Sequence, residues 1–180
     1  MDVEQMVVSM CQAAKKAART LATAPTPVKN QALLQGATQL RQNSGTLLAA
    51  NLQDVEDGRV KGLSSAMLDR LTLTEARIDV MAKGLEIIAD LPDPVGETLT
   101  QWRRPNGLEI GQIRIPLGVV GVIYESRPNV TADAAGLGLK AGNAVILKGG
   151  SEAFRTNSAF TDTLSAAAVE AGLPEAAIQL

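Results

Sequence analysis

Apolar residues recur at helical spacing through the first half of the chain and form short continuous runs in the second half. The spacing predicts an amphipathic helix over residues 2–23, with Asp2 and Gln5 as a capping box. Four further helices are predicted to begin at Thr26, Ser44, Ser64 and Thr74. The last of them ends before residues 92–94, because proline cannot continue a helix. We expect this helical half to form a layer that covers a sheet.

Residues 98–115 have the pattern of a β-hairpin. Asn106 and Gly107 lie between two extended segments, and an Asn-Gly pair in that place is a strong hairpin signal. A two-stranded hairpin alone is marginally stable in water, so it should pack on another surface. Trp102 next to two arginines also allows a nucleic-acid contact, but one aromatic and two cations are too few to favour it.

Residues 116–152 predict a βαβα unit. Residues 118–124 and 144–147 are apolar runs rich in β-branched residues, typical of strands that are buried on both faces of a parallel sheet. Thr131 is expected to cap the helix between them, which ends near Gly142. This order predicts an α/β fold.

Parallel sheets bind ligands beyond the carboxyl ends of their strands. The loops 125–130 and 148–152 should therefore share one rim. Residues 155–171 predict another helix, and residues 177–180 look like the opening of a third strand. Because sheets usually have about four to six strands, we expect this chain to be the N-terminal part of a longer protein.

The composition excludes several classes of function. The net charge is −2, with 17 basic and 19 acidic residues, so no electrostatic signature of a nucleic-acid or membrane partner is present. There is no histidine and one cysteine, so neither a Cys/His metal site nor an internal disulfide can form. We expect Cys11 to be a small buried apolar residue and the protein to be cytoplasmic.

Two runs resemble a known family. They are IPLGVVGVIYESRPNVT at residues 115–131 and AGNAVILKGG at residues 141–150, and the segments 66–71 and 93–96 fit the same pattern. They closely resemble the γ-glutamyl phosphate reductases, also called glutamate-5-semialdehyde dehydrogenases, a proline-biosynthesis branch of the aldehyde dehydrogenase superfamily. The Glu-Ser-Arg-Pro-Asn-Val-Thr loop is particular to that branch, since ordinary aldehyde dehydrogenases carry a Pro-Trp-Asn type loop there.

The resemblance implies a helical N-terminal layer, a β-hairpin arm and the first βαβα of a doubly wound, Rossmann-type parallel sheet. Residues 1–180 would then be an incomplete N-terminal dinucleotide-binding domain, and residues 97–115 the arm of the oligomerisation region. It also implies NADPH or NADP as cofactor and a homo-oligomer joined through the hairpin. The nucleophilic cysteine would lie outside this chain, so we expect the 180 residues alone to be inactive.

The loop after the first predicted strand holds two candidate residues. The Asn129 amide can donate to an oxyanion, and by resemblance it matches the asparagine that does so in the superfamily. Its loop is longer than the Pro-Trp-Asn form, and the alternative is an ordinary turn asparagine. Arg127 suits the phosphate or carboxylate of the substrate, and the alternative is a surface arginine paired with Glu125.

The loop after the second predicted strand precedes a helix N-terminus, where backbone N–H groups attract anions. Residue logic alone indicates a weak anion site there, because both a Rossmann fingerprint and a P-loop are absent from the sequence. The resemblance implies that the cofactor is held by Lys148, Ser151 and Glu152.

The predicted function is NADPH-dependent reduction of L-glutamyl 5-phosphate, a small-molecule substrate, to L-glutamate 5-semialdehyde through a cysteine thioester. Two alternatives stay open. One is another aldehyde-dehydrogenase-like oxidoreductase with a different acyl or aldehyde substrate. The other is a non-catalytic nucleotide-binding or oligomerisation fragment.

Overall fold

The computed structural model describes residues 2–180 of the chain. The helical half contains α1 (Val3–Leu21), α2 (Thr26–Gln42), α3 (Ser44–Val60), α4 (Ser65–Leu71) and α5 (Glu75–Asp90). The hairpin strands are β1 (Thr98–Arg103) and β2 (Glu109–Ile113). There follow β3 (Val119–Ile123), α6 (Pro128–Lys140), β4 (Ala144–Lys148), the 3-10 turn η1 (Ser151–Ala153), α7 (Phe154–Glu170), the 3-10 turn η2 (Glu175–Ala177) and β5 (Ile178–Gln179). The predicted α/β class and βαβα order are confirmed.

The sheet is parallel, with β4 between β3 and β5. Val119 pairs with Ala144 and Ile123 with Lys148, so both strands end at the same rim. β4 is buried apart from its half-buried Ile146 and its exposed last residue, as predicted. The prediction that β3 is buried on both faces is wrong, because Val119 and Ile123 are exposed. Within residues 2–180, β3 is an edge strand with β4 as its one partner.

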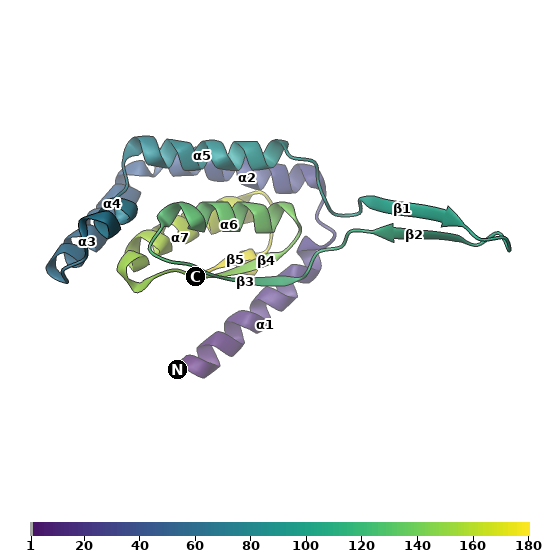
Figure 1. Cartoon of the computed structure of the whole chain (residues 1–180), viewed down its shortest axis with the longest axis horizontal. Helices are drawn as coiled ribbons and strands as arrows, with labels where there is room; N and C mark the ends of the chain where they lie inside the picture. Colours follow the sequence, from purple (N-terminus) through teal and green to yellow (C-terminus); the bar gives the residue numbers. More distant parts are fainter. Residues whose placement is uncertain (1) are drawn as a thin grey trace.

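The core lies between helical layers. α2 and α5 lie over α6 and α7, and the sheet lies beneath α6 with the C-terminal half of α1 on its other face (Figure 1). Fully buried apolar side chains such as Leu85, Val145 and Phe160 fill the space, each stabilising the fold by about 1.5–3 kcal/mol. A Cβ at Gly136 would lie 2.7 Å from Leu85 Cδ2, so a glycine there allows α6 to approach α5 closely.

The sequence predicts caps at Asp2, Ser44, Thr74 and Thr131; the one at Thr74 is confirmed and the other three are wrong, while Ser64 caps α4 without having been predicted to. The Ser64 and Thr74 hydroxyls accept hydrogen bonds from backbone N–H groups in the first turns of α4 and α5. Asp2 makes no capping hydrogen bond, and Ser44 is the first residue inside α3 and does not cap it. Thr131 does not cap α6, because that helix already begins at Pro128, three residues earlier.

The first turns of α1 extend beyond the body of the molecule (Figure 1). Val3, Met6 and Val7 are exposed, and the buried residues of this helix begin at Ala14. The prediction that Cys11 is buried is wrong, since its thiol side chain is exposed. The apolar stripe of these turns has no surface within residues 2–180 to pack against.

The hairpin also projects from the body (Figure 1). β1 and β2 pair antiparallel, and the tip closes with hydrogen bonds of 2.8 Å from Arg104 N to Leu108 O and 2.9 Å from Gly107 N to Arg104 O. Gly107 has φ +85°, a conformation that glycine adopts without strain. The predicted hairpin is confirmed, and all six residues of β1 are exposed.

A buried ion pair fixes the segment between α5 and the hairpin. The fully buried Lys29 of α2 reaches Asp93 Oδ2 at 2.6 Å, and the side-chain hydroxyl of Thr26 donates to the same oxygen. The Val95 N–H donates to the other carboxylate oxygen at 3.0 Å. Although burial alone would raise the pKa of Asp93, these hydrogen bonds and the Lys29 charge hold it below its ordinary value.

Candidate functional site

The two loops beyond β3 and β4 meet at one rim, as the sequence predicts. The Tyr124 N–H donates to the Lys148 carbonyl at 3.1 Å, which extends the pairing of the strands by one step. Further along, the Ser126 hydroxyl donates to Glu152 Oε2 at 2.9 Å. This hydrogen bond therefore joins the loop of Asn129, the candidate oxyanion donor, to the loop of the candidate cofactor-binding residues.

A buried polar chain lies beneath this rim. The Tyr124 and Thr131 hydroxyls are 2.7 Å apart, and Thr131 donates to Asn157 Oδ1 at 3.1 Å. Because Thr131 gives its proton to Asn157, its oxygen accepts from Tyr124. Burial raises the pKa of Tyr124, so this hydroxyl stays protonated at neutral pH. None of these roles was predicted from the sequence, although Tyr124 is its only tyrosine and ends the apolar run 118–124.

The loop 148–152, after β4, passes directly over Asn157, the last residue of this series of hydrogen bonds. A Cβ at Gly149 would lie 2.1 Å from Asn157 Nδ2, so only glycine fits there without movement. Asn157 Nδ2 is buried and has no hydrogen-bond partner within residues 2–180. A Cβ at Gly150 would lie 2.5 Å from Ser126 Oγ and 2.8 Å from Glu152 Oε2. The two glycines therefore set how closely the loops approach one another.

Asn129 is the second residue of α6, directly after the proline that opens the helix. Its side chain is exposed, and its Nδ2 donates a long hydrogen bond of 3.4 Å to Asp133 Oδ2. An amide nitrogen carries two hydrogens. One donor hydrogen of Asn129 is therefore open to a ligand at the rim.

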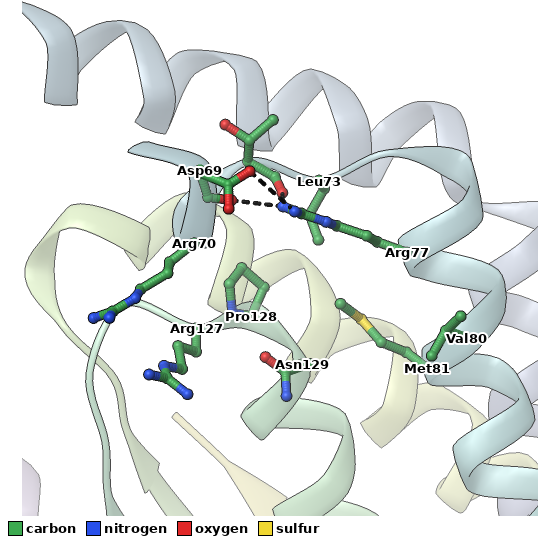
Figure 2. Close-up of a pocket in the computed structure, with 10 residues that line it drawn as sticks. Asp69, Arg70, Leu73, Arg77, Val80, Met81, Arg127, Pro128 and Asn129 are labelled. Carbon is green, nitrogen blue, oxygen red and sulfur yellow. Dashed lines mark hydrogen bonds and ion pairs between the residues drawn. The ribbon is translucent and has the colours of Figure 1, made fainter. Parts of the chain in front are cut away.

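Arg127 is the N-cap residue of α6 and is exposed. Its backbone N–H donates to the Glu125 carbonyl at 2.8 Å. Within residues 2–180 its guanidinium forms no ion pair with Glu125. The structure therefore does not show the alternative, a surface arginine paired with Glu125. The charge is open to solvent beside Asn129 (Figure 2).

A pocket of about 420 Å³ brings these two side chains together with α4 and α5. It is lined by Asp69, Arg70, Thr72, Leu73, Arg77, Val80, Met81, Arg127, Pro128 and Asn129 (Figure 2). Arg77 is already engaged, since its Nη2 reaches Asp69 Oδ1 at 3.1 Å and its Nη1 bonds the backbone carbonyls of Asp69 and Thr72. The pocket combines a free amide donor, free cationic groups and an apolar wall.

A second hollow of about 400 Å³ lies on the other side of Arg127. It is lined by Met67, Arg70, Glu125, Ser126, Arg127, Gly150 and Glu152. The structure therefore brings Arg127 together with Asn129 on one side and with Glu152 on the other. Lys148 and Ser151 are exposed at the rim and line neither hollow.

The loop after β4 carries polar groups of the kind that bond a dinucleotide. The backbone N–H of Glu152 and then the Ser126 hydroxyl lower the pKa of the Glu152 carboxyl, so it is ionised at neutral pH and can accept hydrogen bonds from ribose hydroxyls. Lys148 offers an exposed ammonium group for the same sugar or a phosphate. Gly149 and Gly150 hold this loop close to Asn157, Ser126 and Glu152, which fixes the place of the loop at the rim.

The described residues supply neither a cluster of metal ligands nor a thiol at the rim. Residues 2–180 contain no group of three or more His, Cys, Asp or Glu side chains that could hold a metal ion. The one thiol of the chain, Cys11, lies on the exposed part of α1 and lines neither hollow.

In the same described range, no helix is both long enough and apolar enough to span a bilayer.

The chain is similar along its whole length to proteins of known name and known structure. The chain is 58% identical over 180 residues to the γ-glutamyl phosphate reductase of Moorella thermoacetica, covering 100% of this chain and 43% of that protein. The crystal structure of γ-glutamyl phosphate reductase from Thermotoga maritima superposes with a TM-score of 0.93 at 39% identity, covering 96% of this chain and 42% of that one. The Saccharomyces cerevisiae enzyme of the same name gives a TM-score of 0.92 at 31% identity, covering 100% and 46%.

The chain thus spans less than half the length of the relatives that it matches, and it corresponds to their N-terminal part. The family description that matches is "Aldehyde dehydrogenase family", and the match extends over residues 2–180. The parallel sheet, the shared rim of its two loops and this match lead to one conclusion: the chain belongs to the aldehyde dehydrogenase family.

Proposed function

We propose that the full-length protein that contains this chain reduces L-glutamyl 5-phosphate to L-glutamate 5-semialdehyde with NADPH, a step of proline biosynthesis in the cytoplasm. The observation that carries the proposal is the pocket in which Asn129 and the unpaired Arg127 lie side by side at the rim of the sheet. Relatives that bear this activity in their names match the whole chain, which supports the choice of substrate.

The chemistry requires a thiolate, which attacks the acyl carbon of the substrate and expels inorganic phosphate to leave a thioester. In our proposal this cysteine comes from a segment outside the 180 residues, because no thiol lies at the rim. As the tetrahedral intermediate forms, the free amide hydrogen of Asn129 donates to its oxyanion. Arg127 holds an anionic group of the substrate close by.

The cofactor would supply the hydride that converts the thioester carbon to an aldehyde. We propose that Lys148, Ser151 and Glu152 hold its adenosine ribose. The Ser126–Glu152 hydrogen bond then keeps this loop in register with the loop that carries Asn129. Gly149 and Gly150 support this arrangement, because they let the loop pass close to Asn157 and Ser126.

We also propose that residues 1–180 are an incomplete dinucleotide-binding domain and that residues 97–115 are an arm that packs on a second subunit. An exposed hairpin with Leu99, Trp102 and Ile113 on its surface is marginal by itself, which favours a partner. Replacement of these three residues by serine should lower the sedimentation coefficient of the full-length protein. An unchanged coefficient would contradict the assignment of the arm.

The test of the proposed function compares two proteins and two substrates. The full-length gene product should oxidise glutamate semialdehyde with NADP+ far more efficiently than it oxidises butanal, whereas the 180-residue chain should oxidise neither. Equal efficiency with both aldehydes would favour another aldehyde dehydrogenase activity. Turnover by the 180-residue chain would contradict a nucleophile outside it.

A further inference from the structure

A second unpaired arginine lines the same pocket as Arg127 and Asn129. Arg70 lies in the last turn of α4, 57 residues before Arg127 in the sequence, yet both residues line both hollows. Arg70 is exposed and takes part in no ion pair within residues 2–180. Figure 2 shows the two side chains directed to the same side of the pocket.

The balance of charge differs between the two hollows. The pocket with Asn129 contains three guanidinium groups and one carboxylate, and that carboxylate, Asp69, is bonded to Arg77. Two positive charges are left without a counterion there. The other hollow is lined by the same two arginines together with Glu125 and Glu152, whose negative charges would repel an anion there. An anionic ligand is therefore favoured in the pocket with Asn129.

Arginine presents a planar fork that bonds carboxylates and phosphates with two parallel hydrogen bonds. The guanidinium groups of Arg70 and Arg127 repel each other electrostatically in one pocket. A ligand with two anionic groups would remove this repulsion and be bound by both. L-Glutamyl 5-phosphate has such groups at its two ends, one on the reacting carbon and one on the α-carbon.

The positions of the arginines decide which group each one binds. Arg127 precedes Asn129 by two residues at the start of the same helix, so it lies beside the donor for the reacting carbon. Arg70 belongs to a different element, at the end of α4. We infer that Arg70 binds the α-carboxylate of the substrate while Arg127 binds the phosphate, an inference that rests on the proposed function.

The test compares the KM for glutamate semialdehyde with the KM for inorganic phosphate in variants of the full-length protein. Both are measured in the direction of aldehyde oxidation. Arg70→Ala should raise the KM for glutamate semialdehyde roughly ten- to a hundredfold and leave the KM for inorganic phosphate unchanged, because a hydrogen-bonded charge pair is lost. Arg127→Ala should raise the KM for phosphate instead. Arg70→Lys, which keeps the charge and loses the fork, should be intermediate.

Arg19→Ala is the matched control, because Arg19 is an exposed arginine of α1 that lines neither hollow. Its constants should equal those of the wild type. An unchanged KM for the aldehyde in Arg70→Ala would overturn the inference, and so would a rise in the KM for phosphate. A loss of kcat that is equal for every substrate, together with a lower melting temperature of the variant protein, would show a merely structural role for Arg70. That result would also overturn the inference. Absence of turnover in the wild type would instead defeat the proposed function itself.

Discussion

The Ser126 hydroxyl donates a 2.9 Å hydrogen bond to Glu152 Oε2 and joins the loop after β3 to the loop after β4. This contact links the residues proposed to stabilise the oxyanion with those proposed to hold the cofactor. The Glu152 N–H and the Ser126 hydroxyl also lower the pKa of the carboxyl, which keeps it ionised. The acceptor that our proposal assigns to the ribose is therefore ionised throughout the neutral pH range.

Ser126→Ala should weaken cofactor binding, because it removes a hydrogen bond to a charged group and frees the Glu152 loop. We expect the KM for NADPH in the full-length protein to rise about tenfold, with a smaller change in kcat. Steady-state kinetics from pH 6 to pH 8 should show the same factor at every pH, since Glu152 stays ionised in this range. A fall in kcat with an unchanged KM for NADPH would contradict the proposed role.

Gly149→Ala tests the close approach of the second loop to the buried polar chain. The new Cβ would lie 2.1 Å from Asn157 Nδ2, so the loop has to move and cofactor affinity should fall. Gly45→Ala is the control, because a Cβ at Gly45 on α3 meets no atom within 4 Å. The control should leave affinity unchanged and should stabilise the helix slightly. Equal NADPH affinity for the two variants by fluorescence titration would argue against this account.

Asn129→Ala should affect the chemical step. Removal of one oxyanion donor typically lowers kcat by about 100- to 1,000-fold. The KM for the aldehyde should change little, because the donor acts mainly on the charge that develops in the tetrahedral intermediate. If kcat for glutamate semialdehyde oxidation falls less than about fivefold, Asn129 is only a helix residue at the rim.

Asp93→Asn should destabilise the protein strongly. The substitution leaves the buried Lys29 ammonium without its partner, and breaking a buried pair from one side costs about 3–5 kcal/mol of unfolding free energy. Urea unfolding of the full-length protein measures this loss. The matched control is Asp79→Asn, which breaks exposed ion pairs with Arg41 and Lys83 and should cost much less.

The same pair predicts the pH dependence. Because the folded pKa of Asp93 lies below its ordinary value of 3.8, the pair contributes fully above that value. The contribution is lost as the pH falls through the folded pKa. The difference in unfolding free energy between wild type and Asp93→Asn should therefore be constant from pH 5 to pH 7 and shrink below about pH 3.8. A difference that is unchanged at pH 3 would contradict this account of Asp93.

The rim could be predicted from the sequence because its elements are local. Two short apolar runs, each followed by a polar loop, are enough to place 125–130 beside 148–152 when the strands are parallel. The contacts across the rim could not be predicted. Tyr124 and Asn157 are joined through Thr131, and no local pattern indicates that a residue of α7 reaches back beneath the loops.

The errors have physical causes of the same kind. Thr131 fits the pattern of a cap, but Pro128 is suited to the first turn and begins α6 earlier. Cys11 lies beside an apolar stripe, but burial depends on what the first turns of α1 pack against, which residues 2–180 do not supply. The place of Arg70 beside Arg127 could not be predicted, because α4 meets the rim only in three dimensions.

Aldehyde oxidation by the proposed enzyme should depend on inorganic phosphate. The full-length gene product is incubated with glutamate semialdehyde and NADP+, with and without phosphate, and NADPH formation is followed at 340 nm. We expect NADPH to form only when phosphate is present, because phosphate must cleave the thioester to give L-glutamyl 5-phosphate. NADPH formation at the same rate without phosphate, with glutamate as product, would contradict it.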